Sequence, residues 1–390
     1  MAKIFRMGVI GGGTGGHIYP LIAVSDTIKK QCSQIGLETE VRYFGNPGSY
    51  SFQLEKSGIE LVNIASSKLR RYFSILNFLD FFKFFFGIFQ ALFKLFWFMP
   101  DVIFSKGGPG ALSIIYAARF YKIPIVIHES DAIPGITSTV SAKHADQIEL
   151  TFESAGQYFS GGKPMHVTGT PVRESLFITE SRANARLSLG LLDERPTLLI
   201  VGGSQGAQII NEFVLENSEL LLSRFEIIHQ VGRENFVEYK AEYDFMSKNY
   251  PLDLRKNYLP LPYLDDRKMA LALTAADVIV SRAGAGAIAE IAAFGKPTIL
   301  IPLPTAANNH QRENAYAYAK AGAAIVIEEE NLLPNLFASQ VEKILADKSI
   351  GERMKRASLQ FFKANAAELI AKDLIDASHV LSYYPVEIAS

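Results

Sequence analysis

Two glycines and a glutamate in SRAGAGAIAE (281–290) have the types and spacing to hold a nucleotide sugar. Gly284 and Gly286 suit a tight turn and a close approach of backbone to a ligand, and a helix is expected from Ala285 onward. A helix N-terminus attracts anions such as a diphosphate. Glu290 could then accept hydrogen bonds from both hydroxyls of a ribose. The alternative is a solvated glutamate, which the helix dipole also favours near a helix start.

His17 could act as a general base, because it closes the glycine-rich loop GGGTGGH (11–17) at the start of a helix that we expect Pro20 to enter. A helix N-terminus disfavours imidazolium, and neutral imidazole is what a general base needs. A histidine that only caps or packs is the alternative. The loop also matches the dinucleotide fingerprint G-x-G-x-x-G, but VRYFGNPG (41–48) lacks the acid that should follow, which argues against a nicotinamide enzyme.

Two more polar loops follow predicted strands of the first half. SKGGPGALS (105–113) is a second glycine loop, and HESDAIPG (128–135) carries Glu129 and Asp131. Open α/β sheets bind ligands at the carboxyl ends of their strands. Glu129 and Asp131 could therefore be acid–base groups or acceptors for sugar hydroxyls, and the alternative is a plain polar surface.

The remaining candidates could all contact a sugar nucleotide. Arg173, in PVRES, could reach a phosphate or a base from between two domains. Ser204, in GGSQG, offers a hydroxyl beside backbone amides that suit a diphosphate. His310 and Gln311 open a helix and could bind sugar hydroxyls. Solvated surface residues and exposed helix caps would look the same in the sequence.

Apolar runs of strand length alternate with helical stretches along most of the chain, which predicts an α/β fold of parallel units. Each half opens with a strand that runs into glycines, so we expect two similar domains joined near 168–177. The last helix is expected to pack back on the first domain. The predicted domains are thus 1–170 with 364–390, and 171–363. The predicted strands are 4–10, 40–44, 102–105, 124–127, 147–150, 197–201, 226–230, 278–281, 297–301 and 324–327.

Phenylalanines crowd the stretch 68–100, which predicts a helix with a membrane-facing surface. Its longest uncharged run is shorter than the roughly 20 residues that span a bilayer. Polar positions recur every three or four residues in one narrow stripe, which leaves more apolar surface than the stripe of about 100° that packing on a sheet requires. Apolar surface beside cations suits anionic lipid. A helix buried on nearly all sides, as at a dimer interface, is the alternative. The basic residues nearby are Lys68, Arg70, Arg71, Lys83 and Lys94.

Composition excludes several classes of protein. The 390 residues are enough for two domains, and a net charge of −1 gives no general attraction to nucleic acid. The single cysteine, Cys32, excludes an internal disulfide, and no signal peptide is visible, so we expect a cytoplasmic chain. No metal-binding D-x-D at a strand end, no His/Cys cluster and no P-loop lysine pattern is present. We therefore expect neither a metal nor a cofactor.

The motifs taken together resemble the MurG family of bacterial peptidoglycan N-acetylglucosaminyltransferases, within the glycosyltransferase B superfamily. The resemblance covers nearly the whole chain and implies two Rossmann-like, doubly wound domains that face a cleft. The motifs are GGTGGHIYP (12–20), HESDAIPG (128–135), GTPVR (169–173), GGSQGAQ (202–208), SRAGAGAIAEIAAFGKPTILIPLP (281–304) and NNHQRENA (308–315).

The resemblance implies a reaction and a location. N-acetylglucosamine would pass from UDP-GlcNAc to the 4-hydroxyl of N-acetylmuramoyl-pentapeptide on undecaprenyl diphosphate, with inversion and without a metal. The first domain would hold this lipid acceptor and the second the UDP-sugar. Such an enzyme would lie peripherally on the cytoplasmic face of the bacterial membrane.

The resemblance also implies roles for residues of the donor site. Glu290 would bind the ribose diol, the backbone of Leu264 the uracil, and Gln311 the sugar hydroxyls. Arg173 and Ser204 would contact the nucleotide and its diphosphate. Helix-start amides would come from Ala285, Gly286, Ala287, Ile288 and Ala289, and Thr14, Gly15 and Gly16 would meet the donor from across the cleft.

His17 is the implied base, with Glu129 as a second candidate. Three features depart from the family pattern: Asp131 stands where an asparagine is usual, the loop 105–113 is shorter than usual, and the helix in 68–100 is far richer in phenylalanine than expected. A glycosyltransferase that acts on another lipid-linked acceptor is the nearest alternative. A nucleotide-binding membrane scaffold without activity and a nicotinamide oxidoreductase are the alternatives from other classes.

Overall fold

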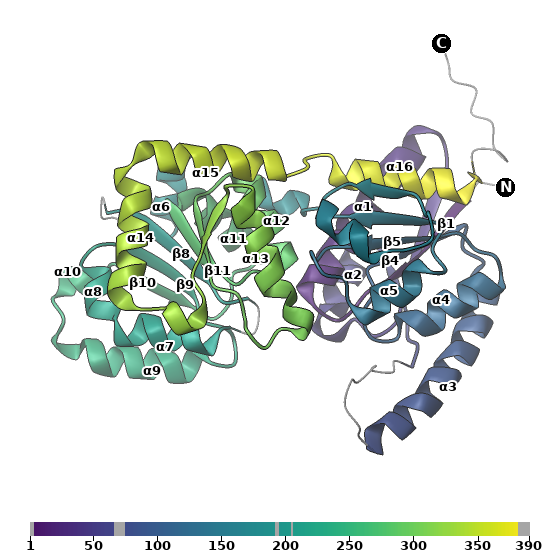
Figure 1. Ribbon diagram of the computed structural model, residues 1–390, viewed down its shortest axis with the longest axis horizontal. Helices are drawn as coiled ribbons and strands as arrows, with labels where there is room; N and C mark the ends of the chain where they lie inside the picture. Colours follow the sequence, from purple (N-terminus) through teal and green to yellow (C-terminus); the bar gives the residue numbers. More distant parts are fainter. Residues whose placement is uncertain (1–3, 66–74, 192–194, 204–205, 381–390) are drawn as a thin grey trace, which may run out of the picture. The chain divides into compact units, whose positions relative to one another are not determined.

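The computed structural model divides into two compact units, which are described separately (Figure 1). Unit 1 comprises Met1–Arg173 with Lys363–Ser390, and unit 2 comprises Glu174–Phe362. The structure describes residues 4–65, 75–191, 195–203 and 206–380, and the side chains of 75–81 and of residue 307 also lie outside the description.

Unit 1 is built on a parallel sheet with the strand order β3-β2-β1-β4-β5-β6-β7. The order reverses between β1 and β4, so the loops that follow these two strands open at a topological switch point, where such sheets bind ligands. The strands are β1 (Ile4–Ile10), β2 (Glu38–Phe44), β3 (Glu60–Val62), β4 (Val102–Ser105), β5 (Ile125–Glu129), β6 (Gln147–Leu150) and β7 (Met165–Val167). The helices are α1 (Gly15–Gln34), α2 (Ser51–Lys56), α3 (Ile75–Phe98), α4 (Ala111–Phe120), α5 (Ile136–Ala142) and α16 (Ala366–Ser378).

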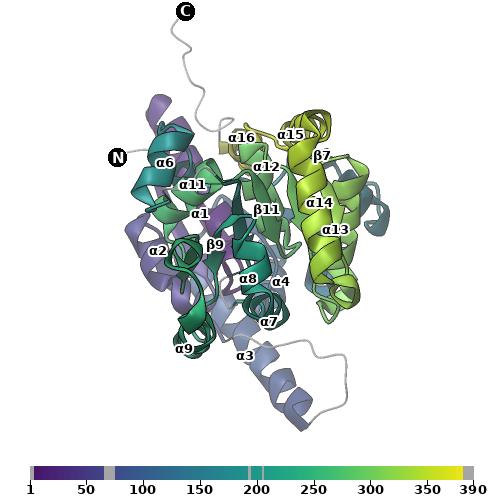
Figure 2. The ribbon, with the colours of Figure 1, turned by 90° about the vertical axis from the view of Figure 1, so that its left-hand side faces the viewer.

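Unit 2 repeats this plan with the parallel order β10-β9-β8-β11-β12-β13, and helices lie on both sides of its strands (Figure 2). Its switch point lies between β8 and β11. The strands are β8 (Thr197–Val201), β9 (Glu226–Gln230), β10 (Tyr258–Leu261), β11 (Val278–Ser281), β12 (Thr298–Leu300) and β13 (Ala324–Val326). The helices are α6 (Arg182–Ser188), α7 (Gln208–Glu216), α8 (Ser218–Leu222), α9 (Phe236–Met246), α10 (Leu252–Arg255), α11 (Asp266–Ala275), α12 (Ala285–Phe294), α13 (His310–Lys320), α14 (Pro334–Ala346) and α15 (Lys348–Phe361).

The predicted α/β class with two doubly wound sheets is confirmed, and every predicted strand is present. Three strands were missed: β3, β7 and β10. All three lie at sheet edges. Strand β7 is exposed along its whole length, and β10 contains Pro260, which a sheet tolerates at an edge. Strands β3 and β7 have only three residues each and no continuous apolar run, and Pro260 made the segment of β10 look unlike a strand.

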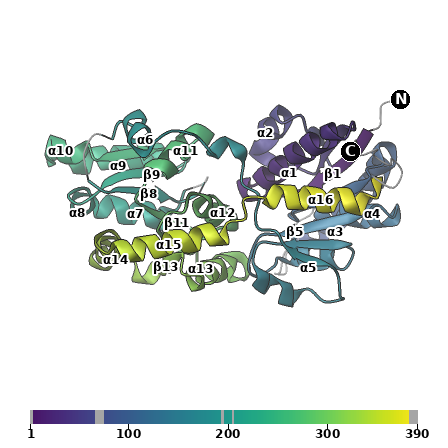
Figure 3. The ribbon, with the colours of Figure 1, turned by 90° about the horizontal axis from the view of Figure 1, so that it is seen from above.

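The C-terminal helix α16 completes the core of unit 1. It lies along α1 (Figure 3), and Ile370 and Leu374 share one buried cluster with Ile18 and Leu21 of α1. The chain therefore returns to unit 1 after unit 2 is finished.

Three positions of the polar stripe on helix α3, namely Gly87, Gln90 and Lys94, face unit 1, and the aromatic side chains of 82–97 named below are exposed. A Cβ on Gly87 would lie 2.7 Å from the carbonyl oxygen of Ala65, and Oε1 of Gln90 accepts a hydrogen bond from Ala65 N–H at 2.9 Å. Lys94 donates to the carbonyl of Asn63. Lys94 thus stabilises the attachment of the helix. The outer aromatic face consists of Phe82, Phe85, Phe86, Phe89, Phe93, Phe96 and Trp97, each more than half exposed.

Within the described ranges, no helix is long and apolar enough to cross a membrane.

Candidate functional site

Two glycine-rich loops of unit 1 meet backbone to backbone at its switch point. The first follows β1 and the second follows β4. Gly108, in the second loop, has a φ of +92°, and a Cβ there would lie 2.6 Å from the backbone nitrogen of Gly12. A Cβ on Gly12 would in turn lie 2.7 Å from Nδ1 of His17. Glycine at both positions therefore allows the second loop to pack on the loop that carries His17.

His17 lies in the first turn of α1, and Thr14 is the N-cap of that helix. The expectation that Pro20 enters the helix is wrong, because α1 begins at Gly15 and Pro20 lies inside it. Oγ1 of Thr14 and Nδ1 of His17 are 3.1 Å apart. If Nδ1–H donates to Thr14, Nε2 is left to accept a proton, as a general base requires. Around Gly16 no atom lies within 4 Å of a Cβ position, so its backbone is open to approach.

Glu129 ends β5 and is 5% exposed. Its Oε1 accepts a hydrogen bond from the backbone N–H of Asp131 at 2.9 Å, whereas its buried Oε2 has no hydrogen-bond partner. Burial and then the neighbouring carboxylate of Asp131 raise the pKa of Glu129 to about 7. A carboxyl group with this pKa can exchange a proton near neutral pH.

Lys106 is a member of this site that the sequence reasoning missed. It directly follows β4, is 3% exposed, and donates from Nζ to Nδ1 of His128 and to Oγ of Ser130. Burial lowers its pKa to about 8, against the opposing charges of Glu129 and Asp131. A lysine at the end of a buried strand, next to two glycines, was the available signal.

Arg173, the last residue of the first segment of unit 1, is buried against α1. Its guanidinium carbon lies 3.8 Å from the ring centroid of Tyr19, a cation–π contact. Upstream in the same segment, the carbonyl of Gly169 accepts a hydrogen bond from Nε2 of His128 at 2.8 Å. The segment is thereby tied to both α1 and the end of β5.

In unit 2, Gln230 at the end of β9 joins two loops at the edge of the sheet where the carboxyl ends of its strands lie. Its Nε2 donates to the carbonyl of Gly203 at 2.7 Å, and its Oε1 accepts from the N–H of Leu264 at 3.2 Å. Gly206, with a φ of +82°, lies so close to β9 that a Cβ would be 2.1 Å from the carbonyl oxygen of Val231. Gln230 was also missed; it ends the buried strand EIIHQ. Ser204 lies outside the described residues.

Helix α12 begins at the end of β11, with Gly284 as its N-cap. The tight-turn explanation for Gly284 and Gly286 is wrong, because neither has a positive φ. Around Gly284 no atom lies within 4 Å of a Cβ position, so the expected close approach of a ligand is still possible. Ile288 N–H already donates to Gly284 at 3.0 Å, so the amides without a partner in the helix belong to its first turn, at Ala285, Gly286 and Ala287. Glu290 is half-buried one turn further on.

Helix α13 is fixed to the start of α12 by Asn314, whose Nδ2 donates to the carbonyl of Ala283 at 3.1 Å. Gln311, in the first turn of α13, accepts a hydrogen bond at Oε1 from the N–H of Leu303 at 3.1 Å. This contact orients the amide so that its remaining polar atom is the donor Nε2, which suits hydroxyl oxygens. His310 opens the helix and is half-buried.

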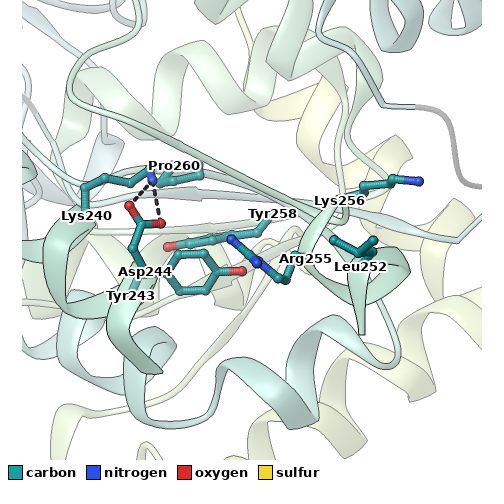
Figure 4. Close-up of a pocket in the computed structure, with 8 residues that line it drawn as sticks. All are labelled: Lys240, Tyr243, Asp244, Leu252, Arg255, Lys256, Tyr258 and Pro260. Atoms are coloured by element: carbon teal, nitrogen blue, oxygen red, sulfur yellow. Dashed lines mark hydrogen bonds and ion pairs between the residues drawn. The ribbon is translucent and has the colours of Figure 1, made fainter. Parts of the chain in front are cut away.

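Two other features lie away from these loops. A cavity of about 330 Å³ lies beside the edge strand β10, between α9 and α10 (Figure 4). None of its lining residues was predicted as a site residue.

In unit 1, Glu149 on β6 is the strand partner of His166 on β7, and Nδ1 of His166 is 2.7 Å from Oδ2 of Asp373. Nε2 of Gln147 donates to Oε1 of Glu149 at 2.7 Å and lies 3.0 Å from Nδ1 of His166, so the amide of Gln147 lies within this cluster.

Known families match both halves of the chain. The glycosyltransferase family 28 N-terminal domain matches residues 7–149, and the glycosyltransferase family 28 C-terminal domain matches residues 197–371. Among solved structures, MurG of Acinetobacter baumannii is 25% identical, with a TM-score of 0.70 over 95% of this chain and 99% of that chain. The UDP-GlcNAc 2-epimerase of Neisseria meningitidis, at 14% identity and a TM-score of 0.68, shares the fold alone.

Curated relatives extend over nearly the full length. A protein of Caldicellulosiruptor saccharolyticus is 36% identical over 93% of this chain and 95% of its own length, and one of Clostridium botulinum is 35% identical over 93% and 97%. Both are named UDP-N-acetylglucosamine–N-acetylmuramyl-(pentapeptide) pyrophosphoryl-undecaprenol N-acetylglucosamine transferase. The chain described here belongs to this family of glycosyltransferases, the MurG family.

Proposed function

We propose that this chain transfers N-acetylglucosamine from UDP-GlcNAc to the 4-hydroxyl of N-acetylmuramoyl-pentapeptide on undecaprenyl diphosphate, with inversion of the anomeric carbon. The observation that carries the proposal is the 36% identity, over 93% of the chain, to a relative named for this transfer. Both family 28 domains are present, and the chain is a glycosyltransferase. The reaction needs no cofactor and, in this proposal, no metal.

The UDP-sugar would bind to unit 2 at the carboxyl ends of β8 and β11. The loop 202–206, with Ser204, and the first turn of α12 would hold the diphosphate, because backbone amides and the helix dipole both favour an anion. Glu290 would accept hydrogen bonds from the ribose hydroxyls, and the backbone of Leu264 would meet the uracil. Gln311, with His310, would bind the sugar hydroxyls. The oriented Nε2 of Gln311 supports that role.

Unit 1 would hold the acceptor and take up its proton. Nε2 of His17 removes the proton of the acceptor hydroxyl, whose oxygen forms a bond to the anomeric carbon while the bond from that carbon to the diphosphate oxygen breaks. The leaving UDP carries the electron pair, and first-turn amides of α12 stabilise its charge. Thr14 holds the required tautomer of His17, and Glu129 is the alternative base. Gly15, Gly16, Asp131 and Arg173 would complete the contacts to the two substrates.

The aromatic face of α3 would dock the enzyme on the cytoplasmic face of the bacterial membrane. Gly87, Gln90 and Lys94 face unit 1, and the exposed residues of 82–97 are largely phenylalanine with Trp97. One end of helix α3 projects from unit 1 (Figures 1 and 2), as an inserting element requires, and Ala91, Leu95 and Phe98 at its other end lie in the core of the unit. Lys83 is exposed on the same helix and would favour anionic lipid. Lys68, Arg70 and Arg71 lie outside the described residues.

The test is transfer of labelled N-acetylglucosamine from UDP-GlcNAc to the muramoyl-pentapeptide lipid in the presence of EDTA. We expect product with wild type. Glu290→Ala should lower kcat/KM for UDP-GlcNAc about ten- to a hundredfold, because hydrogen bonds to a charged group are worth about 1.5–3 kcal/mol. Glu313→Ala removes an exposed glutamate of α13 and serves as the matched control.

The outcomes separate the alternatives. Binding of UDP-GlcNAc without any product would reject this acceptor and favour a glycosyltransferase that acts on another lipid-linked acceptor. No binding of UDP-GlcNAc would contradict the donor assignment as a whole.

A further inference from the structure

Lys106 brings a buried positive charge to a part of unit 1 that is otherwise rich in carboxylates. The loop that carries it is anchored by the hydrogen bond from Lys106 N–H to the carbonyl of Ile10 at 2.8 Å. The ammonium contacts two neutral acceptors, Nδ1 of His128 and Oγ of Ser130. A buried cation with only neutral contacts depends on nearby negative charge for compensation.

His128 cannot share this positive charge. Its Nε2 donates to the carbonyl of Gly169 at 2.8 Å, so the proton of the neutral ring lies on Nε2 and Nδ1 accepts from Lys106. Burial, followed by the charge of Lys106, lowers the pKa of His128 well below its usual value. The cation of this cluster is therefore the lysine.

Glu129 lies in the sequence between the two residues that Lys106 contacts, and its charge opposes the effect of burial on the pKa of Lys106. Its side chain is almost fully buried, its Oε2 accepts no hydrogen bond, and the carboxylate of Asp131 adds a like charge on the same loop. From β6, Leu150 is its strand partner, and α5 contributes the hydroxyl of Ser138. Burial and Asp131 both favour protonation of Glu129, and Lys106 opposes them.

We propose that Lys106 is a positioning residue that holds the 128–131 loop at the end of β5 and keeps Glu129 ionised for the transfer reaction. The ammonium contacts the residue on each side of Glu129 in the sequence, so one side chain fixes both the path of the loop and its charge balance. The inference rests on the proposed function, in which Glu129 is the alternative base.

The first test measures Glu129 directly and needs no turnover. Carbon-13 NMR of carboxyl-labelled glutamate gives its titration midpoint, with Glu129→Gln to assign the signal. Lys106→Gln removes the charge but keeps a hydrogen-bond donor, and we expect it to move the midpoint upward by about one pH unit or more. Lys106→Arg keeps the charge and should titrate close to wild type. Lys143→Gln, at an exposed lysine of the same unit, is the control.

The second test is the pH dependence of kcat for transfer. If Glu129 must be ionised, kcat falls at acidic pH as Glu129 becomes protonated. In Lys106→Gln this fall should occur at a higher pH, and at a given acidic pH kcat should be about tenfold lower for each pH unit of the shift. KM for UDP-GlcNAc should stay within about twofold, because the donor contacts of the proposal lie on unit 2. Lys106→Met replaces Lys106→Gln if the latter does not fold, with the same expected shift.

Three results would overturn the inference: an unchanged Glu129 midpoint in Lys106→Gln, a Lys106→Arg variant that titrates like Lys106→Gln, or an equal loss of kcat at every pH. The last would indicate a packing role alone.

If wild type transfers nothing to the muramoyl lipid and the midpoint still moves, the proposed function fails and the electrostatic role of Lys106 stands. If wild type is active and the midpoint does not move, the role of Lys106 fails by itself.

Discussion

The backbone N–H of Leu264 donates a hydrogen bond to Oε1 of Gln230 at 3.2 Å. The other end of the same amide holds Gly203, so one buried side chain fixes both the segment proposed to meet the uracil and the loop proposed to meet the diphosphate. Donor recognition in unit 2 is thus expected to depend on a residue that touches no part of the donor.

Gln230→Ala tests this dependence. Loss of two hydrogen bonds of about 0.5–1.5 kcal/mol each should raise KM for UDP-GlcNAc about five- to 150-fold, with a smaller effect on kcat. Steady-state kinetics with varied donor measures the effect. Gln360→Ala, at an exposed glutamine of α15, is the control. Equal KM values for the two variants would show that Gln230 does not organise the donor loops.

His17→Ala should lower kcat about 10²–10⁴-fold, the usual contribution of a general base. Thr14→Val removes the partner of Nδ1 while it keeps the size of the side chain, and should cost about tenfold through loss of the productive tautomer. His144→Ala, which changes another histidine of unit 1, should transfer normally. Undiminished transfer by His17→Ala would reject His17 as the base and leave Glu129 as the candidate.

The aromatic face of α3 gives a prediction about membranes. Phe89, Phe93 and Trp97 are 61–71% exposed, and burial of a large apolar side chain is worth about 1.5–3 kcal/mol. The combined change of all three to serine should weaken binding to vesicles with anionic lipid at least tenfold in a co-sedimentation assay. Phe245→Ser, at an equally exposed phenylalanine of unit 2, is the control.

The same triple variant tests the alternative of a dimer interface. If vesicle binding is unaffected but a wild-type dimer becomes monomeric in sedimentation velocity, the aromatic face serves association between copies of the chain. We expect the opposite result.

Glu149 should make the stability of unit 1 depend on pH. Burial, and then the charge of Asp373, raises its pKa to about 7. The folded state therefore holds a proton that the unfolded state releases near pH 4.5, and stability falls as pH rises through this interval. Glu149→Gln should stabilise the protein by about 1–3 kcal/mol at pH 8 and by little at pH 4. Urea denaturation at both values measures this, with the exposed Glu153→Gln as control.

The sequence predicted the central strands because buried parallel strands are continuous apolar runs, as in 197–201 and 278–281. The family was also predicted correctly, since its motifs are glycine loops whose spacing is fixed by backbone contacts such as Gly108 on Gly12. The roles of His17, Glu290 and Gln311 remain predictions.

Lys106 and Gln230 escaped prediction for a shared reason. Each acts through partners distant in the sequence, so no local spacing marks it: Lys106 reaches His128, and Gln230 reaches Leu264. The inward orientation of Gln90 and Lys94 on α3 escaped for a related reason. Periodicity shows that a helix has two faces, but contacts such as Ala65 to Gln90 decide which of them is buried.

The return of α16 to α1 has a consequence for synthesis on the ribosome. Unit 2 is one continuous segment and is synthesised in full while unit 1 still lacks the helix that covers Ile18 and Leu21. The earlier part of the chain therefore keeps an uncovered apolar face until residues 366–378 have been synthesised. A premature stop at Lys363 would release a protein with a complete unit 2 and an incomplete unit 1 that is prone to aggregate.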